Sequence, residues 1–198
     1  ALGPDMQVYP NRFDNEIAGQ LKPCYMLFGD EPHQKLSMIQ SVRRRAREEG
    51  FDERTVFVAD KDFSWSQLVE ATQTLSLFSS AQVIELELPT GKPGTEGSKT
   101  LQEIAPSLGH DVLLVVHGPK IGKDVQRAKW FKVLDEIGVF SLAYPLEGKH
   151  LDTWLSQTLK AFSLTADTDV IRLIAEFTEG NMLAAYQEIE KLALVYQN

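Results

Sequence analysis

At 198 residues, 43% hydrophobic and 24% charged, the chain is long enough to bury a sizeable core and has an ordinary globular composition. It contains no apolar run long enough to span a bilayer, and no secretory signal opens it. The formal net charge of −8 argues against a protein that holds nucleic acid mainly by neutralising phosphates.

Cysteine and histidine usage argues against disulfide and metal chemistry. The single cysteine, Cys24, excludes an internal disulfide framework and favours a reducing cytosol. It lies in an apolar run, so we expect a buried thiol rather than a nucleophile. The four histidines are scattered without the spacing of metal ligands. We therefore expect no metal and no cofactor.

The predicted elements alternate between strands and helices up to residue 144. Residues 1–5 resemble a cloning remnant, and Met6 is the expected natural start. Strands are expected at 24–28, 55–59, 82–88, 111–117 and 139–144, with helices at 34–49, from 64, at 100–107 and at 124–137. The fourth strand is apolar enough to be central, whereas the third alternates and is placed nearer an edge. This alternation predicts an α/β domain with a parallel sheet flanked by helices.

Beyond Pro145 the strand pattern ends and helical periodicity takes over. It covers residues 150–162, 167–177 and 181–195. We therefore expect two domains, an α/β domain over residues 1–145 and a small three-helix domain over residues 146–198.

The turn after the first strand resembles a phosphate-binding loop that has lost some of its parts. Of the pattern G-x-x-x-x-G-K-[ST] it keeps Gly29 and Lys35, but Gln34 and Leu36 replace the second glycine and the hydroxyl residue. Glycine lets backbone N–H groups wrap phosphates, and the hydroxyl binds Mg²⁺, which leucine cannot do. One alternative is an ordinary strand-to-helix turn. Another is an ATP-binding AAA+ or other P-loop enzyme that uses Lys35.

Two further segments lack residues that are typical of an active ATPase. The apolar strand that ends at Val116 is followed by His117 and Gly118, not by the acidic pair that would hold Mg²⁺. Residues 179–185 resemble the motif of AAA+ lid domains, but Leu183 stands where an arginine is normal. These departures predict an AAA+-like protein that does not hydrolyse ATP.

Residues 73–80 combine features of a helix end and of a binding peptide. Ser64 and Gln67 fit a capping box at the start of the helix that leads into them. Leu77 and Phe78 are adjacent, so they cannot share one helical face, and a serine pair follows them. Either this pair closes the domain core, as in a scaffold domain, or at least one side chain points outward as a wedge.

The run Gln73-x-Leu75-Ser76-Leu77-Phe78 resembles the short peptide with which many bacterial proteins enter the apolar pocket of the DNA polymerase sliding clamp. Its place at a helix tip, and the sequence that follows it, are similar to the delta subunit of the bacterial DNA polymerase III clamp loader. The resemblance extends over essentially residues 6–198. Members of this family carry a third, C-terminal collar domain, so the chain looks like their first two domains.

This resemblance implies a non-catalytic subunit of a DNA polymerase holoenzyme, a nucleotidyltransferase, in the bacterial cytoplasm. Leu75, Leu77 and Phe78 would enter the pocket of the sliding clamp (the beta subunit), with Gln73 and Ser76 at its rim, and docking would favour the opened ring. The delta prime and tau/gamma subunits would bind through the collar domain. DNA would be held only weakly or within the full complex. The basic stretches at 43–47 and 120–132 are either solvated faces or DNA contacts.

Overall fold

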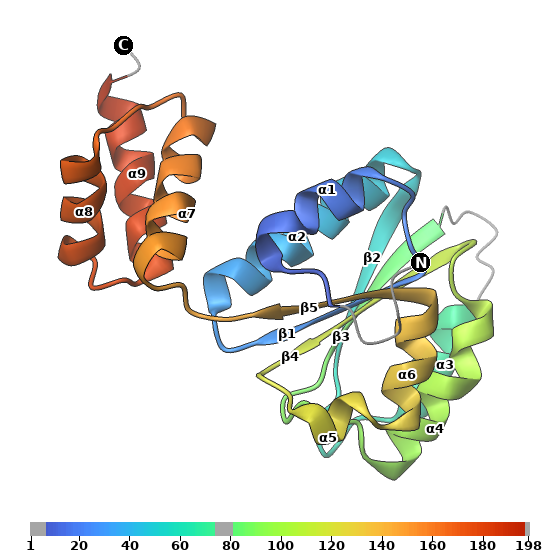
Figure 1. Cartoon of the computed structure of the whole chain (residues 1–198). Helices are drawn as coiled ribbons and strands as arrows, with labels where there is room; N and C mark the ends of the chain where they lie inside the picture. Colours follow the sequence, from blue (N-terminus) through green and yellow to red (C-terminus); the bar gives the residue numbers. More distant parts are fainter. Residues whose placement is uncertain (1–6, 74–80, 197–198) are drawn as a thin grey trace. The chain divides into compact units, whose positions relative to one another are not determined.

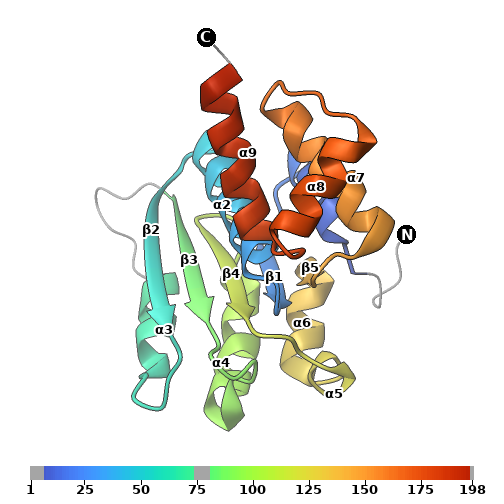
Figure 2. The same cartoon turned by 90° about the vertical axis from the view of Figure 1, so that its left-hand side faces the viewer.

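The computed structural model describes residues 7–73 and 81–196, and the strands in this part of the chain form one parallel sheet. The sheet order is β2-β3-β4-β1-β5, and every neighbouring pair is parallel (Figures 1 and 2). The strands are β1 (Cys24–Gly29), β2 (Phe51–Val58), β3 (Ala81–Glu87), β4 (Val112–Gly118) and β5 (Gly138–Ala143). The predicted α/β class with a parallel sheet is confirmed.

Helices cover both faces of the sheet (Figure 1). One face carries α1 (Phe13–Ala18), which follows a 3-10 turn at Pro10–Arg12, and α2 (Pro32–Glu48). The other face carries α3 (Trp65–Gln73), α4 (Gly94–Ile104) with a 3-10 turn at Ala105–Ser107, α5 (Lys123–Gln126) and α6 (Lys129–Ile137). The predicted single helix at 124–137 is wrong, because the chain is extended at Ala128 (φ −65°, ψ 146°) and separates α5 from α6.

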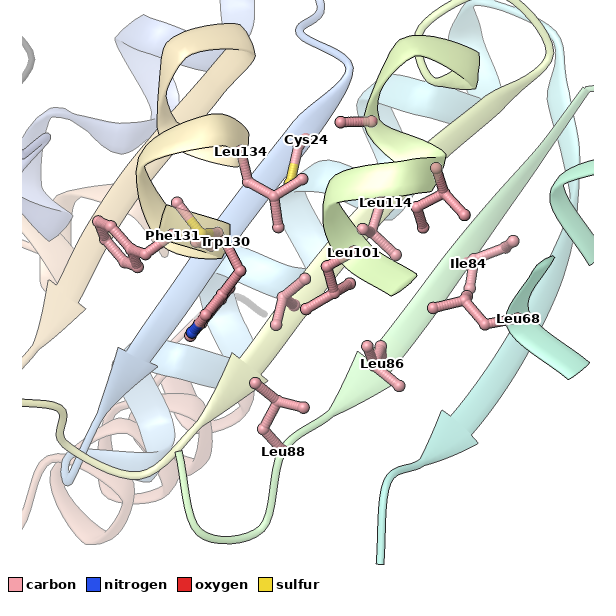
Figure 3. Close-up of a cluster of buried hydrophobic side chains, with 14 of the residues drawn as sticks. Cys24, Leu68, Ile84, Leu86, Leu88, Leu101, Leu114, Trp130, Phe131 and Leu134 are labelled. Carbon is pink, nitrogen blue, oxygen red and sulfur yellow. The ribbon is translucent and has the colours of Figure 1, made fainter. Parts of the chain in front are cut away.

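The two faces of the sheet build two separate apolar cores. Figure 3 shows part of the core under α3, α4 and α6, where Ile84 and Leu86 of β3 lie near Leu68 of α3. Cys24 is fully buried in this core, as its apolar run predicts, and burial raises the pKa of its thiol. A thiol in this environment stays protonated and is a poor nucleophile.

The positions of β4 and β3 in the sheet agree with their sequence patterns. The apolar run of β4 places it in the middle of the sheet, as predicted. The alternating β3 lies nearer an edge than β4, as predicted, and β2 lies outside it as the edge strand itself. β2 also begins four residues before the predicted start, with exposed charged side chains from Asp52 to Arg54.

By its contacts the chain divides into two compact units. The first comprises residues 1–30 and 35–143, and the second comprises residues 31–34 and 144–198. The second unit contains α7 (Gly148–Ala161), α8 (Thr168–Phe177) and α9 (Met182–Tyr196). These helices share a core of their own, made of Leu151, Leu155, Leu159, Ile174, Met182, Ala185 and Ile189.

Candidate functional site

Packing against a neighbouring strand explains why glycine occupies position 29, at the start of the loop between β1 and α2. Gly29 has a φ of 140°, and a Cβ atom there would lie 2.0 Å from the carbonyl oxygen of Ala143 on the neighbouring strand β5. A side chain at this position would therefore collide with the backbone. Because the sheet itself requires this glycine, its presence is no sign of a bound phosphate.

A carboxylate of the chain occupies the N-terminus of α2. Oε1 of Glu31 accepts a hydrogen bond of 2.9 Å from the backbone N–H of Gln34, and Glu31 is buried. Pro32 follows as the first helical residue, where the lack of an N–H is harmless. Phosphate-binding loops use such a helix terminus to hold an anion, because its N–H groups point outward. Here Glu31 supplies the anion.

The ammonium group of Lys35 is held by two backbone carbonyls. Nζ donates to the oxygen of Gly29 at 3.1 Å and to the oxygen of Gly118 at 3.0 Å, so it joins the ends of the neighbouring strands β1 and β4. Burial lowers the pKa of Lys35, and the charges of Glu87 and Asp30 oppose that shift. Lys35 therefore links the ends of β1 and β4 through hydrogen bonds to their backbone carbonyls.

The remaining loop residues have partners of their own or lack donor atoms. Oδ1 of Asp30 accepts from the backbone N–H of Lys120 at 3.1 Å. Within the second unit, the buried amide of Gln34 accepts from the N–H of Tyr144 at 3.0 Å and donates to the sulfur of Met182 at 3.6 Å. Leu36, at the hydroxyl position of the phosphate-loop pattern, is 48% exposed and offers no oxygen. These residues do not fit a magnesium nucleotide.

Sequence reasoning missed a buried ion pair beside this loop. Glu85 of β3 is 2% exposed, and its carboxylate accepts two hydrogen bonds from Arg43 of α2, at 2.7 and 2.6 Å. Arg54 of β2 lies 3.3 Å from the same carboxylate. The pair ties α2 to the β2–β3 edge of the sheet.

His117, at the end of β4, is half-buried next to these charges. Burial lowers the pKa of its imidazole, while the nearby carboxylates of Glu87 and Glu85 oppose the shift. Among the described residues, no group of three His, Cys, Asp or Glu side chains is placed to hold a metal ion. The described part of the chain also has no helix that is long and apolar enough to cross a membrane.

The predicted clamp-binding peptide lies almost wholly outside the described residues. Gln73 is the exposed last residue of α3, whereas Leu75, Ser76, Leu77 and Phe78 fall between the described ranges. The capping box expected before this helix does not form, because the Ser64 hydroxyl pairs with the hydroxyl of Ser66 at 2.8 Å.

Both ends of the segment 74–80 are nevertheless attached to well-packed elements. Before it, Trp65 and Leu68 bury α3 against the sheet. After it, the side-chain amide of Gln82 donates to the carbonyl of Ala71 at 2.8 Å and accepts from the hydroxyl of Thr55 at 2.9 Å. Gln82 thereby connects the start of β3 to α3 and to β2. The elements on either side of residues 74–80 are therefore held firmly to the sheet and to each other.

The structure accounts for Asn181 in the lid-like motif at 179–185 and for Arg45 in the basic stretch at 43–47 by contacts within the chain. The side chain of Asn181 caps α9 by accepting from the N–H of Ala184 at 2.9 Å, and Leu183 is 48% exposed. In the stretch 43–47, Arg45 donates to the carbonyls of Ile17 and Gly19. The cations of the stretch 120–132 are all exposed, namely Lys120, Lys123, Arg127, Lys129 and Lys132.

A five-stranded parallel sheet with helices on both faces, and a lysine-bearing loop after β1, give this chain an AAA+-like fold. The model of the family "DNA polymerase III, delta subunit" matches residues 25–141. The chain belongs to this family.

Relatives and a solved structure agree with this assignment. The chain is 29% identical to DNA polymerase III subunit delta of Escherichia coli over 191 residues and 28% identical to that of Haemophilus influenzae over 193 residues. In each case it covers 56% of the relative, so it spans little more than half of their length. The DNA clamp loader delta protein of Bacillus subtilis has a similar fold, with a TM-score of 0.73 at 19% identity over 94% of this chain and 57% of that one.

Proposed function

We propose that this chain binds the replicative sliding clamp through residues 73–78 and promotes opening of the ring for loading onto primed DNA. The observation that carries the proposal is the run Gln-x-Leu-Ser-Leu-Phe at the end of α3, in a member of the delta subunit family. The anchoring of α3 and β3 on either side of this run supports it, since an interaction peptide works best on rigid elements.

The apolar side chains supply the binding energy in this proposal. Leu77 and Phe78, with Leu75 beside them, enter an apolar pocket of the clamp, and Gln73 and Ser76 are polar partners at its rim. Full burial of a leucine or phenylalanine side chain contributes roughly 1.5–3 kcal/mol. Ring opening requires only that the protein bind the open clamp more tightly than the closed one.

The rest of the chain serves as a non-catalytic frame. Residues 1–145 form the AAA+-like domain, and residues 146–198 form its lid domain. The loop at 29–36 supports the absence of ATP hydrolysis, because Glu31 and the two strand carbonyls take the places of phosphate contacts. In the whole cytoplasmic protein, a further C-terminal domain joins the delta prime and tau/gamma subunits, and DNA is held within the full complex.

The test is the affinity of the double variant Leu77→Ala/Phe78→Ala for purified bacterial sliding clamp, measured by surface plasmon resonance. We expect binding to weaken at least about a hundredfold. The matched control is Val56→Ala/Val58→Ala on β2, an exposed apolar pair whose truncation leaves the affinity unchanged. Equal clamp affinity of the wild-type protein and the first variant would refute the proposal.

Two rival hypotheses make different predictions for the same proteins. If Leu77 and Phe78 belonged to the core, their truncation would lower the free energy of unfolding by several kcal/mol and leave the clamp affinity of the folded protein intact. If the chain were a P-loop NTPase, it would bind ATP with Mg²⁺, and Lys35→Ala would abolish that binding. Urea denaturation and equilibrium dialysis with ATP separate these cases from the proposal.

A further inference from the structure

The smaller, second unit exposes most of the large apolar side chains that reach solvent. Among the described residues, eight of the twelve exposed large apolar side chains belong to it. Scattered exposed apolar residues are normal on a protein surface, but a concentration of them marks an interaction site.

Helix α8 carries the most regular part of this surface. Its exposed apolar residues recur at spacings of three and four, which places them in one row along the helix. We name this set the outer row of α8. It consists of Val170, Leu173 and Phe177, which are 40, 64 and 74% exposed.

The outer row is surplus to the packing of the three-helix unit. α8 already faces the core of that unit with Ile174, and Ile171 and Ala175 pack beside it. At 100° per residue, the apolar positions from Leu173 round to Ala175 cover an arc of about 200°. A helix that packs on one core needs an apolar stripe of only about 100°. The apolar arc is therefore wide enough for a second partner.

The border of the outer row is acidic. On the helical projection Asp169 and Glu176 lie about 40° and 60° from Leu173, on the side away from the core. Both side chains are exposed, and Arg172 lies farther round the helix. A partner surface that complements this border carries lysine or arginine next to its own apolar residues.

The outer row is too small to hold a second copy of this chain by itself. Three partly exposed apolar side chains offer roughly 300 Å² of contact area, given that one large aromatic side chain buries 150–250 Å². A stable interface buries about 800 Å² on each partner. The outer row is thus an anchor within a larger interface, and it does not hold a dimer alone.

We propose that the outer row of α8 docks onto an apolar helix face, bordered by basic residues, on another subunit of the clamp loader. This inference rests on the proposed function, which makes the chain a clamp-loader subunit. It adds a contact on the second unit to the one expected through the C-terminal domain of the whole protein.

The experiment uses the full-length protein and a purified complex of the delta prime and tau/gamma subunits from the same organism. Leu173→Ser/Phe177→Ser is expected to raise the Kd for that complex at least about tenfold. Asp169→Lys/Glu176→Lys is expected to raise it as well, by repelling the basic border. The control Val56→Ser/Val58→Ser removes a comparable exposed pair from β2 and leaves the Kd unchanged.

Clamp affinity, Tm and sedimentation of the same variants distinguish the proposal from its alternatives. Unchanged clamp affinity and unchanged Tm in the serine variant, together with a raised Kd for the subunits, support the proposal. A lower Tm of the full-length variant would show that the outer row is covered by its own chain and would overturn it. An unchanged Kd would also overturn it, as would loss of a wild-type self-association in sedimentation runs. Failure of the wild-type protein to bind the clamp counts against the proposed function alone.

Discussion

Replacing Lys35 with methionine tests whether this lysine links two strands or binds phosphate. Methionine keeps most of the aliphatic stem and removes only the ammonium group. In the structure that group donates to Gly29 at 3.1 Å and to Gly118 at 3.0 Å, and both glycines are buried. The variant therefore leaves two buried carbonyls without this donor.

The expected cost is about 2 kcal/mol in the free energy of unfolding. A hydrogen bond from a charged donor contributes about 1.5–3 kcal/mol, and there are two of them. Part of this is recovered, because burial disfavours the ammonium of Lys35 and the variant removes that penalty. For a chain of this size, 2 kcal/mol corresponds to a fall in Tm of about 4–8 °C.

The assay is urea denaturation followed by tryptophan fluorescence. Trp65 and Trp130 lie in the first unit, and Trp154 lies in the second, so a Trp154→Phe background restricts the probe to the unit that contains Lys35. Lys61→Met, at an exposed lysine, serves as the control. A Lys35→Met protein that keeps its full stability but loses binding of ATP and Mg²⁺ would refute the structural role.

Two further predictions concern groups near the same loop. Arg43→Leu is expected to cost about 3 kcal/mol of stability, because it removes both hydrogen bonds that Arg43 donates to the buried carboxylate of Glu85 and leaves Arg54 at 3.3 Å. Adding Glu85→Leu should recover much of this loss in a double-mutant cycle by urea denaturation. Burial lowers the pKa of His117 below its ordinary value of about 6.5, so the unfolded chain takes up this proton first as the pH falls. The contribution of His117 is therefore fully present above pH 6.5 and is lost as the pH falls through the lowered pKa; His117→Gln should reduce the difference in stability between pH 7.5 and 5.5.

Buried parallel strands were predictable because their sequences are apolar on both faces. β1 and β4 lie between two helical layers, so neither face needs a polar side chain. The edge strand β2 was placed too short, since its exposed start carries charged residues typical of a loop. The break between α5 and α6 was missed, because no glycine or proline marks the extended backbone at Ala128.

The hydrogen-bond acceptors of Lys35 could not be predicted from the sequence. The spacing from Gly29 to Lys35 is visible in the sequence, but the acceptors of Lys35 are backbone carbonyls, and one of them is 83 residues away. Backbone acceptors carry no residue signature. The Arg43–Glu85 pair was hidden for a related reason, because alternation along β3 suggested solvent where α2 in fact supplies an arginine.

The loop at 29–36 and the start of β3 lie at opposite ends of the parallel strands. The loop at 29–36 follows the carboxyl end of β1, whereas residues 74–80 precede the amino end of β3, and all the strands run parallel. A strand of six residues at 3.3 Å per residue separates its two ends by roughly 20 Å. In a nucleotide-binding loop, a ligand would satisfy the helix terminus and the lysine. Here Glu31 and two strand carbonyls satisfy these groups, so the loop needs no ligand to pair them. Under the proposed function, clamp binding would therefore need no nucleotide in this loop, and the timing of that binding would come from the other subunits.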